Sequence, residues 1–286
     1  MSPPSLSSLV VSDWSFSASV AVPATVSMVL YGLGVHRTRV RWPLRRTASF
    51  GAGVACVILA LQSGIDAYDD RMLSVHMVQH MLLLLIAPPL LLGGRPLILA
   101  LRAMSPGPRR SFANAVDTAR AYTGPFPSLA FFGVVVVLTH LPSFYDATLR
   151  DPTLHDCEHA LYLVAGLLMW SPLLDADPAP RHRLNGLGKL AYLIAAMLPM
   201  ALVGAYLNRH ATLVYTGYGP PARALGISAL HDQAEAGAIM WVVGNSIMVI
   251  VGLWSAVATM VTEERRQIAR ESRGASLATG DGGPSA

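Results

Sequence analysis

The chain has 286 residues, of which 53% are hydrophobic and 13% are charged, and its mean hydropathy is +0.46. This is more apolar surface than one soluble core of ordinary composition can bury, which favours a protein embedded in lipid. The net charge of +4 does not indicate a nucleic-acid partner, because the basic residues lie between apolar segments and not on one solvated face.

Seven apolar stretches follow one another along the chain. A bilayer core about 30 Å thick takes ~20 residues per helix, and each stretch has about that length. They cover residues 17–36, 47–65, 72–92, 125–141, 155–174, 188–207 and 233–259. The third ends in Pro88-Pro89 and Pro142 closes the fourth, as expected of residues that break a helix. The sequence therefore predicts an all-α, polytopic transmembrane bundle of about seven helices.

Two terminal segments flank the predicted transmembrane domain of residues 17–261. Residues 1–16 contain no lysine or arginine and so lack the basic region of a cleavable signal peptide, and we expect a short external leader. Residues 262–286 end in a Gly/Ser/Ala-rich stretch, which predicts a disordered cytoplasmic tail.

The distribution of basic residues predicts the orientation of the bundle. Most of the 21 lysines and arginines follow the first, third, fifth and seventh stretches. The opposite side has few, and it also has the acidic residues Asp66, Asp69 and Asp70. Since lysine and arginine in short loops stay in the cytoplasm during insertion, we expect the N-terminus outside and the C-terminus inside. The chain is thus predicted to be a multi-pass protein of the bacterial inner membrane.

Six histidines lie at the outer ends of four predicted helices: His76, His80, His140, His155, His159 and His231. His76 and His80 open the third helix, and His155 and His159 open the fifth. Residues four apart share one helix face, so each pair can present two imidazoles to one ion. If the four helices are neighbours, all six side chains converge on a metal site.

Four further residues accompany these histidines. Glu158 and Glu235 are acids within apolar helices, where polar groups normally face the bundle interior. We expect them to orient ligating imidazoles, although direct ligation is the alternative. Asp232 adjoins His231, and Cys157 is either a ligand or a small packing residue.

Copper is the metal that this pattern favours. Imidazole binds copper, zinc and iron, and nearby sulfur atoms favour Cu(I). Zinc is a weaker candidate. Haem is another, but two histidines on one helix do not suit a single haem held between helices. The competing interpretation is that the histidines only cap helices or pack.

Several motifs resemble the CtaG family of cytochrome c oxidase assembly factors. They are Ser74-Val-His76-Met-Val-Gln-His80-Met81, Ala87-Pro-Pro89, Gly94-Arg-Pro96, Thr139-His140-Leu-Pro142, Leu154-His155, Glu158-His159, Asp232-Gln233 and Met240-Trp241. They occur in the family's order over roughly residues 60–255. The resemblance implies a multi-pass membrane factor that delivers copper to the oxidase, with oxidase subunits and membrane lipids as partners and no enzymatic activity of its own.

Two other functions remain open at this point. In a membrane-embedded hydrolase, three imidazoles hold zinc and Glu158 or Glu235 acts as general base, but the chain has no HExxH motif. In a structural scaffold for oxidase assembly, the histidines bind no metal. No phosphate-binding GxxxxGK[ST] motif is present, so nucleotide use is not expected.

Overall fold

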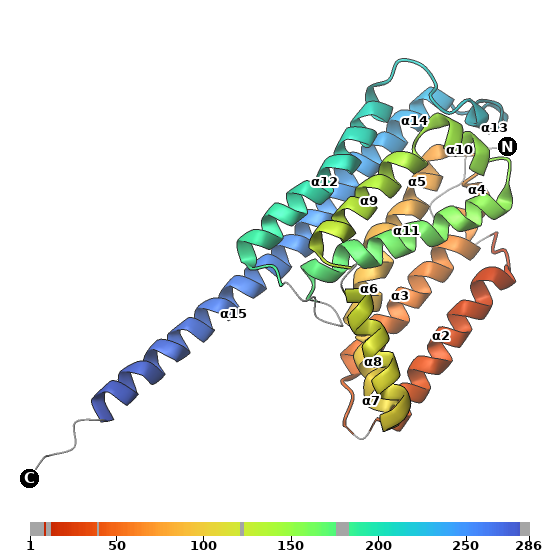
Figure 1. The fold of residues 1–286 in the computed structure, drawn as a ribbon. Coiled ribbons are helices and arrows are strands. Elements are labelled where there is room, and N and C mark those ends of the chain that lie inside the picture. Colours follow the sequence, from red (N-terminus) through yellow and green to blue (C-terminus); the bar gives the residue numbers. More distant parts are fainter. Residues whose placement is uncertain (1–8, 10–12, 39, 121–122, 176–182, 281–286) are drawn as a thin grey trace, which may run out of the picture.

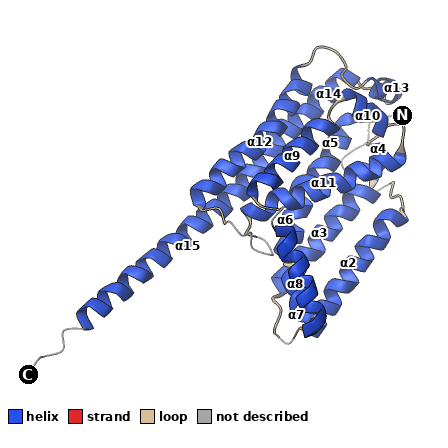
Figure 2. Ribbon diagram, viewed as in Figure 1, coloured by secondary structure: helices blue, strands red, loops and turns tan. Residues whose placement is uncertain are grey.

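The computed structural model describes residues 9, 13–38, 40–120, 123–175 and 183–280. Over these residues the regular elements are helices, and none is a strand (Figure 2). The helices of the N-terminal half are α2 (Ala18–Arg37), α3 (Leu44–Gln62), α4 (Gly64–Tyr68), α5 (Leu73–Met81), the π-helix η1 (Leu82–Ile86), α6 (Ala87–Gly93), α7 (Pro96–Ala103) and α8 (Pro106–Arg120). The all-α class is confirmed.

The remaining elements complete the bundle (Figure 1). They are α9 (Pro125–Thr139), α10 (Pro142–Thr148), α11 (Pro152–Leu173), α12 (Gly186–Arg209), the 3-10 helix η2 (Thr216–Tyr218), α13 (Gly219–Ala224), α14 (Ala229–Ala238), the π-helix η3 (Ile239–Gly244) and α15 (Asn245–Gly280). The short elements α4, α10, α13 and α14 gather at one end of the bundle, which we call the His end because α5 and α11 begin there (Figure 1).

The number of membrane spans agrees roughly with the prediction. Within the described residues, five helical segments are long and apolar enough to cross a membrane: Ala18–Arg37, Leu44–Tyr68, Leu73–Ala103, Gly186–Arg209 and Ala229–Ala269. A sixth is added if α9 and α10, which are bent by 76°, count as one span. α11 also runs through the bundle, but its first two turns are too polar for that composition (Figure 1). The N-out orientation stays a prediction.

α11 packs closely against the backbone of the third predicted span at the π-helical turn η1. Pro88 has no N–H, so it leaves the carbonyl of Leu84 without its usual helical donor. The indole Nε1 of Trp170 on α11 donates to that oxygen at 3.2 Å. Gly166, one turn earlier, has no Cβ, and a Cβ there would lie 2.5 Å from the same oxygen. The proline and the glycine together fix how α11 packs on η1.

The two terminal segments differ in how they meet the prediction. Of the proposed leader, residues 1–8 and 10–12 lie outside the described residues. Further along it, the Ser15 N–H donates to the carbonyl of Gln62 at 2.9 Å, which holds the chain against the end of α3. At the C-terminus α15 continues as a helix to Gly280, and residues 281–286 lie outside the described residues (Figure 1). Disorder of the tail from Thr262 stays a prediction. The stretch Glu263–Glu271 is rich in Glu, Arg, Gln and Ala, which are good helix formers.

Candidate metal centre

Two helices bring four of the predicted histidines together. His76 and His80 project from α5, with their Nε2 atoms 2.7 Å apart. His155 and His159 project from α11, with ring centroids 4.2 Å apart. Across the two helices, the ring centroids of His76 and His155 are 5.0 Å apart, and those of His80 and His159 are 5.9 Å apart. We call these four side chains the His cluster.

The His cluster is buried and its ring nitrogens are under-used. His76 and His80 are 0% exposed and His159 is 4% exposed. Nδ1 of His80 and Nε2 of His155 and His159 have no hydrogen-bond partner among the described residues. Buried polar atoms are normally paired, because leaving one unpaired costs about 1–3 kcal/mol. Several unpaired nitrogens in one buried cluster are therefore a reason to look for a ligand.

Tyr218 fixes the orientation of one imidazole. Its hydroxyl lies 2.8 Å from the carbonyl of Asp69, to which it donates, and 2.9 Å from Nδ1 of His76. A hydroxyl has one hydrogen, so it accepts the second bond from His76 Nδ1–H. The Nε2 lone pair of His76 then faces Nε2 of His80, 2.7 Å away. Ligating histidines likewise have their other ring nitrogen held by the protein.

Three sets of residues each offer three donor atoms that lie within 4.8 Å of one another. Two of the sets include a carboxylate. The sets are His76, His80 and His159; Asp69, His155 and His159; and His76, His155 and Glu158. Oδ2 of Asp69 lies 3.8 Å from Nε2 of His155 and has no hydrogen bond within the described parts of the chain. Glu158 is 1% exposed, and the Thr148 hydroxyl lies near it. The structure thus offers nitrogen and oxygen donors in one buried volume.

Burial is the main cause of the pKa shifts of Asp69 and Tyr218, the two residues beside the cluster that lie outside the long helices. It raises the pKa of the Asp69 carboxyl well above its usual range, and the neighbouring Asp66 carboxylate adds to that rise. It also raises the pKa of the Tyr218 phenol, so this hydroxyl stays protonated and remains a donor. A cation beside Asp69 would oppose the effect of burial and stabilise the carboxylate.

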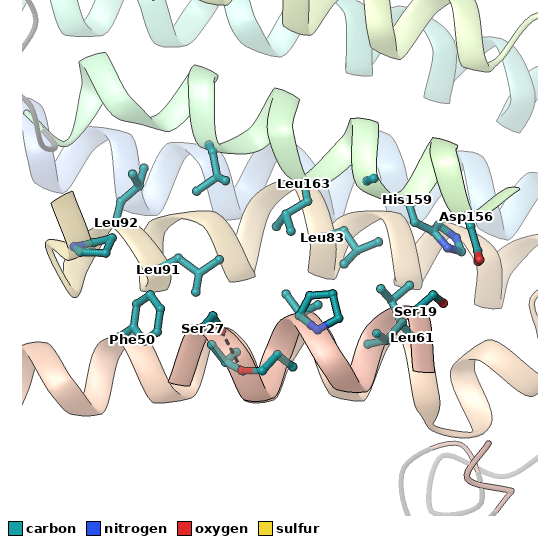
Figure 3. A pocket seen from close by; sticks show the side chains of 18 residues that line it. Ser19, Ser27, Phe50, Leu61, Leu83, Leu91, Leu92, Asp156, His159 and Leu163 are labelled. Carbon is teal, nitrogen blue, oxygen red and sulfur yellow. Dashed lines mark hydrogen bonds between the residues drawn. The ribbon is translucent and has the colours of Figure 1, made fainter. Parts of the chain in front are cut away.

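An apolar crevice reaches the cluster from another side (Figure 3). It has a volume of about 480 Å³ and lies among α2, α3, η1, α6 and α11. His159 and Asp156 stand at one end of it, beyond Leu61, Leu83 and Leu163 (Figure 3). His159 therefore separates the buried imidazoles from a lipid-like lining.

Comparison with known proteins places the chain in a family. The sequence model of the cytochrome c oxidase caa3 assembly factors (CtaG) matches residues 29–261. The chain belongs to the caa3 assembly factor family. The match extends the predicted resemblance into α2 and α3, where the sequence shows few recognisable motifs.

Curated relatives of the chain come from mycobacteria. Uncharacterized protein Mb0105 of Mycobacterium bovis is 29% identical over 92% of the chain and 42% of its own length. Uncharacterized protein MT0111 of Mycobacterium tuberculosis has the same values, and uncharacterized protein ML1998 of Mycobacterium leprae is 26% identical over 91% of the chain and 41% of its own length. The chain spans about two fifths of the length of these relatives. No solved structure matches the sequence.

His140 lies beside the His cluster. Its ring centroid is 6.4 Å from that of His80, and its Nδ1 lies 2.8 Å from the carbonyl of Val136. Its Nε2 has no hydrogen-bond partner within the described residues. His140 is therefore a neighbour of the three sets of donors. The phenol oxygen of Tyr162, whose ring stacks on His80, lies 3.3 Å from Nδ1 of His140.

The other predicted residues are not brought to the centre of the His cluster. The side chain of His231 is 75% exposed, and its Nε2 contacts Glu235 at 3.2 Å. Cys157 is exposed on α11. The physical reason is helical geometry: α14 turns Asp232 and Gln233 inward, and His231 and Glu235 then point outward. Convergence of all six histidines was therefore wrong for His231.

Asp232 instead holds the beginning of α5. Its carboxylate accepts from the backbone N–H of Leu73 at 2.6 Å, from the N–H of Ser74 at 3.3 Å and from the hydroxyl of Ser74. Free N–H groups at a helix start are normally satisfied by such an acceptor. Asp232 supports His76 by fixing the turn from which that side chain projects.

Replacing Asp232 tests this role. Asp232→Ala is expected to lower the free energy of unfolding by about 1–3 kcal/mol, because buried donors at the start of α5 lose their acceptor. Thermal unfolding in detergent measures the change. Glu235→Ala, on the exposed face of the same helix, is the matched control and is expected to leave the transition unchanged. Equal transitions for the two variants would contradict the capping role.

Asp69 and Tyr218 were missed as site residues by sequence reasoning. Asp69 was noted only as one of three acids on the outer side, and nothing in the sequence separates it from Asp66 and Asp70. Tyr218 lies in a loop far along the chain from α5 and has no spacing that links it to His76. Only the packing of η2 against the His end brings its hydroxyl to the imidazole.

Proposed function

We propose that this assembly factor carries copper for cytochrome c oxidase and that the His cluster holds the ion. The observation that supports the proposal most directly is the meeting of four imidazoles from α5 and α11, with unpaired nitrogens in a buried volume. Burying several imidazoles together costs free energy if their nitrogens stay unpaired. The same nitrogens are suitable ligands for copper. An ion bound there would give unpaired nitrogens of the cluster a partner. In this proposal copper is cargo, and the protein is a carrier without catalytic activity.

The family match supports cytochrome c oxidase as the protein that receives the copper. Its members are described as assembly factors of caa3 cytochrome c oxidase, an enzyme that needs copper. A copper carrier for this enzyme is expected to act at the outer face of the membrane, where the dinuclear copper site of an oxidase lies. The charge asymmetry of the loops puts the His end on that face of the bacterial inner membrane. We therefore infer that oxidase subunits approach this end, while lipids cover the sides of the bundle.

Metal retention tests the proposal. The protein is purified in mild detergent, loaded with Cu(I) under reducing conditions, passed over a desalting column and measured by mass spectrometry for bound metal. We expect about one copper ion per chain, since the three donor sets share His76, His155 and His159 and so compete for the same ion. A His76→Ala/His80→Ala variant is expected to retain almost none. Loading with Zn(II) in parallel shows whether the site prefers copper.

A matched control uses histidines outside the cluster. The variant His210→Ala/His231→Ala removes the same number of imidazoles from the same end of the protein. It is expected to retain copper like the wild-type protein. Copper retention that is equal in both double variants, or absent from the wild-type protein, would contradict a carrier role for the His cluster.

A further inference from the structure

The His cluster has a second set of donors at its exposed edge. Asp69, His155 and His159 offer one oxygen and two nitrogens within 4.8 Å of one another. The inner set of His76, His80 and His159 offers three nitrogens at the same mutual distance. His159 belongs to both. Resting on the proposed function, we infer that Asp69 and His155 form an outer position through which a single copper ion reaches and leaves the inner imidazoles.

The shared histidine makes the two positions alternatives. A neutral imidazole has one nitrogen lone pair, so His159 ligates one ion at a time. An ion in the outer position therefore leaves the inner set incomplete, and an ion in the inner position leaves the outer one incomplete. One ion that moves between overlapping positions satisfies both sets, whereas two ions at once do not.

Exposure increases from the inner position to the outer one. His76 and His80 are 0% exposed, whereas the side chain of His155 is 18% exposed. The Asp69 side chain, at 5%, lies next to His155 with an oxygen 3.8 Å from its Nε2. A hydrated ion thus meets His155 first and loses its water as it approaches His159.

The charges around the outer position favour an arriving cation. The acidic residues Asp66, Asp70 and Asp156 lie around Asp69 and His155. Arg71 is the basic residue next to this group, and its Nε contacts Asp70 at 3.6 Å. Negative charge at the mouth of a site raises the local concentration of a cation and its rate of association. The other approach to His159 is the apolar crevice, where an ion would have to cross a hydrocarbon-like lining (Figure 3).

The two donor sets also differ in chemistry. A carboxylate is a hard oxygen ligand, while imidazole suits copper better. The outer position is therefore the weaker one, and the ion passes inward toward three nitrogens. The same order provides a route out, because the outer ligands can take the ion before a partner protein does. A carrier needs such a step, since a closed all-protein shell holds metal and does not release it.

The rate of copper loading tests the outer position. Detergent-purified protein is mixed rapidly with a coloured Cu(I) chelate, and the loss of the chelate's absorbance gives the rate. Asp69→Asn is expected to load about tenfold more slowly than wild-type protein, because the outer set loses its carboxylate ligand and keeps only a weaker amide donor. It is expected to bind the same final amount, because the inner set is intact. Asp69 Oδ2 makes no hydrogen bond in the described structure, so we expect this variant to fold normally.

Two comparisons make the outcome specific. Asp70→Asn removes a neighbouring carboxylate that belongs to neither donor set, and it is expected to load much faster than Asp69→Asn. His155→Ala, which also removes an outer ligand, is expected to load slowly like Asp69→Asn. If Asp69→Asn loads as fast as Asp70→Asn, or if two ions bind per wild-type chain, the outer position is wrong and the carrier function stands. If the wild-type protein binds no copper, the carrier function fails first.

Discussion

Cells in which the His76→Ala/His80→Ala variant replaces the wild-type protein are expected to lose most of their cytochrome c oxidase activity. Loss of one supporting residue at a metal site typically costs about 10- to 100-fold in affinity, so loss of two donors is expected to reduce oxidase activity to below about a tenth. The reason is that an oxidase without its copper is inactive. Membranes are assayed for oxidase activity, and the copper to haem ratio of the purified oxidase is measured.

The copper to haem ratio separates two explanations of a low activity. A copper carrier that fails leaves oxidase with haem and little copper, and added copper in the medium is expected to restore part of the activity. A failed scaffold leaves less oxidase, with a normal ratio. Cells with His210→Ala/His231→Ala serve as the control and should respire normally. A normal copper to haem ratio in the His76→Ala/His80→Ala cells would rule out copper delivery by the cluster.

Gly166→Leu is expected to prevent normal folding of the bundle. A Cβ at this position would lie 2.5 Å from the carbonyl oxygen of Leu84 and 2.6 Å from the ring of Pro88. Neither neighbour can turn away, because one is backbone and the other a ring. Overpacking against movable side chains already costs about 1–3 kcal/mol, and we expect a larger loss here. The yield of monodisperse protein and its melting temperature in detergent measure the effect.

Gly133→Leu on α9 is the matched control for Gly166→Leu. No heavy atom from another part of the described structure lies within 4 Å of a Cβ built at Gly133. The same substitution there adds an apolar side chain without a clash, and a normal yield is expected. If Gly166→Leu behaves like Gly133→Leu, the close approach of α11 to η1 is not needed for the fold.

The bundle and the paired histidines could be predicted from sequence because both follow local rules. Apolar stretches of the length of a bilayer predict helices without any knowledge of their neighbours. Two histidines four residues apart share a face in any helix, so the pairs on α5 and α11 needed only one further condition, which was that the helices meet. The structure satisfies that condition, with the rings of His76 and His155 5.0 Å apart.

What could not be predicted depends on how each helix is turned and on loops. The position of His231 near the start of a helix gave no indication that Asp232 would face inward in its place. Asp69 and Tyr218 join the site through segments that have no periodic pattern of their own. α15 continues past Thr262, where the charged composition is compatible with a solvated helix as well as with disorder.

The arrangement of the cluster on two helices has a mechanical consequence for a carrier. An ion held by α5 and α11 is a removable cross-link between segments that are far apart in the chain. Binding to the folded state alone stabilises that state in proportion to the logarithm of ligand concentration over the dissociation constant. A loaded molecule therefore has a stiffer His end than one that has delivered its ion. A partner protein that binds the His end would therefore meet a stiffer surface before delivery of the ion than after it.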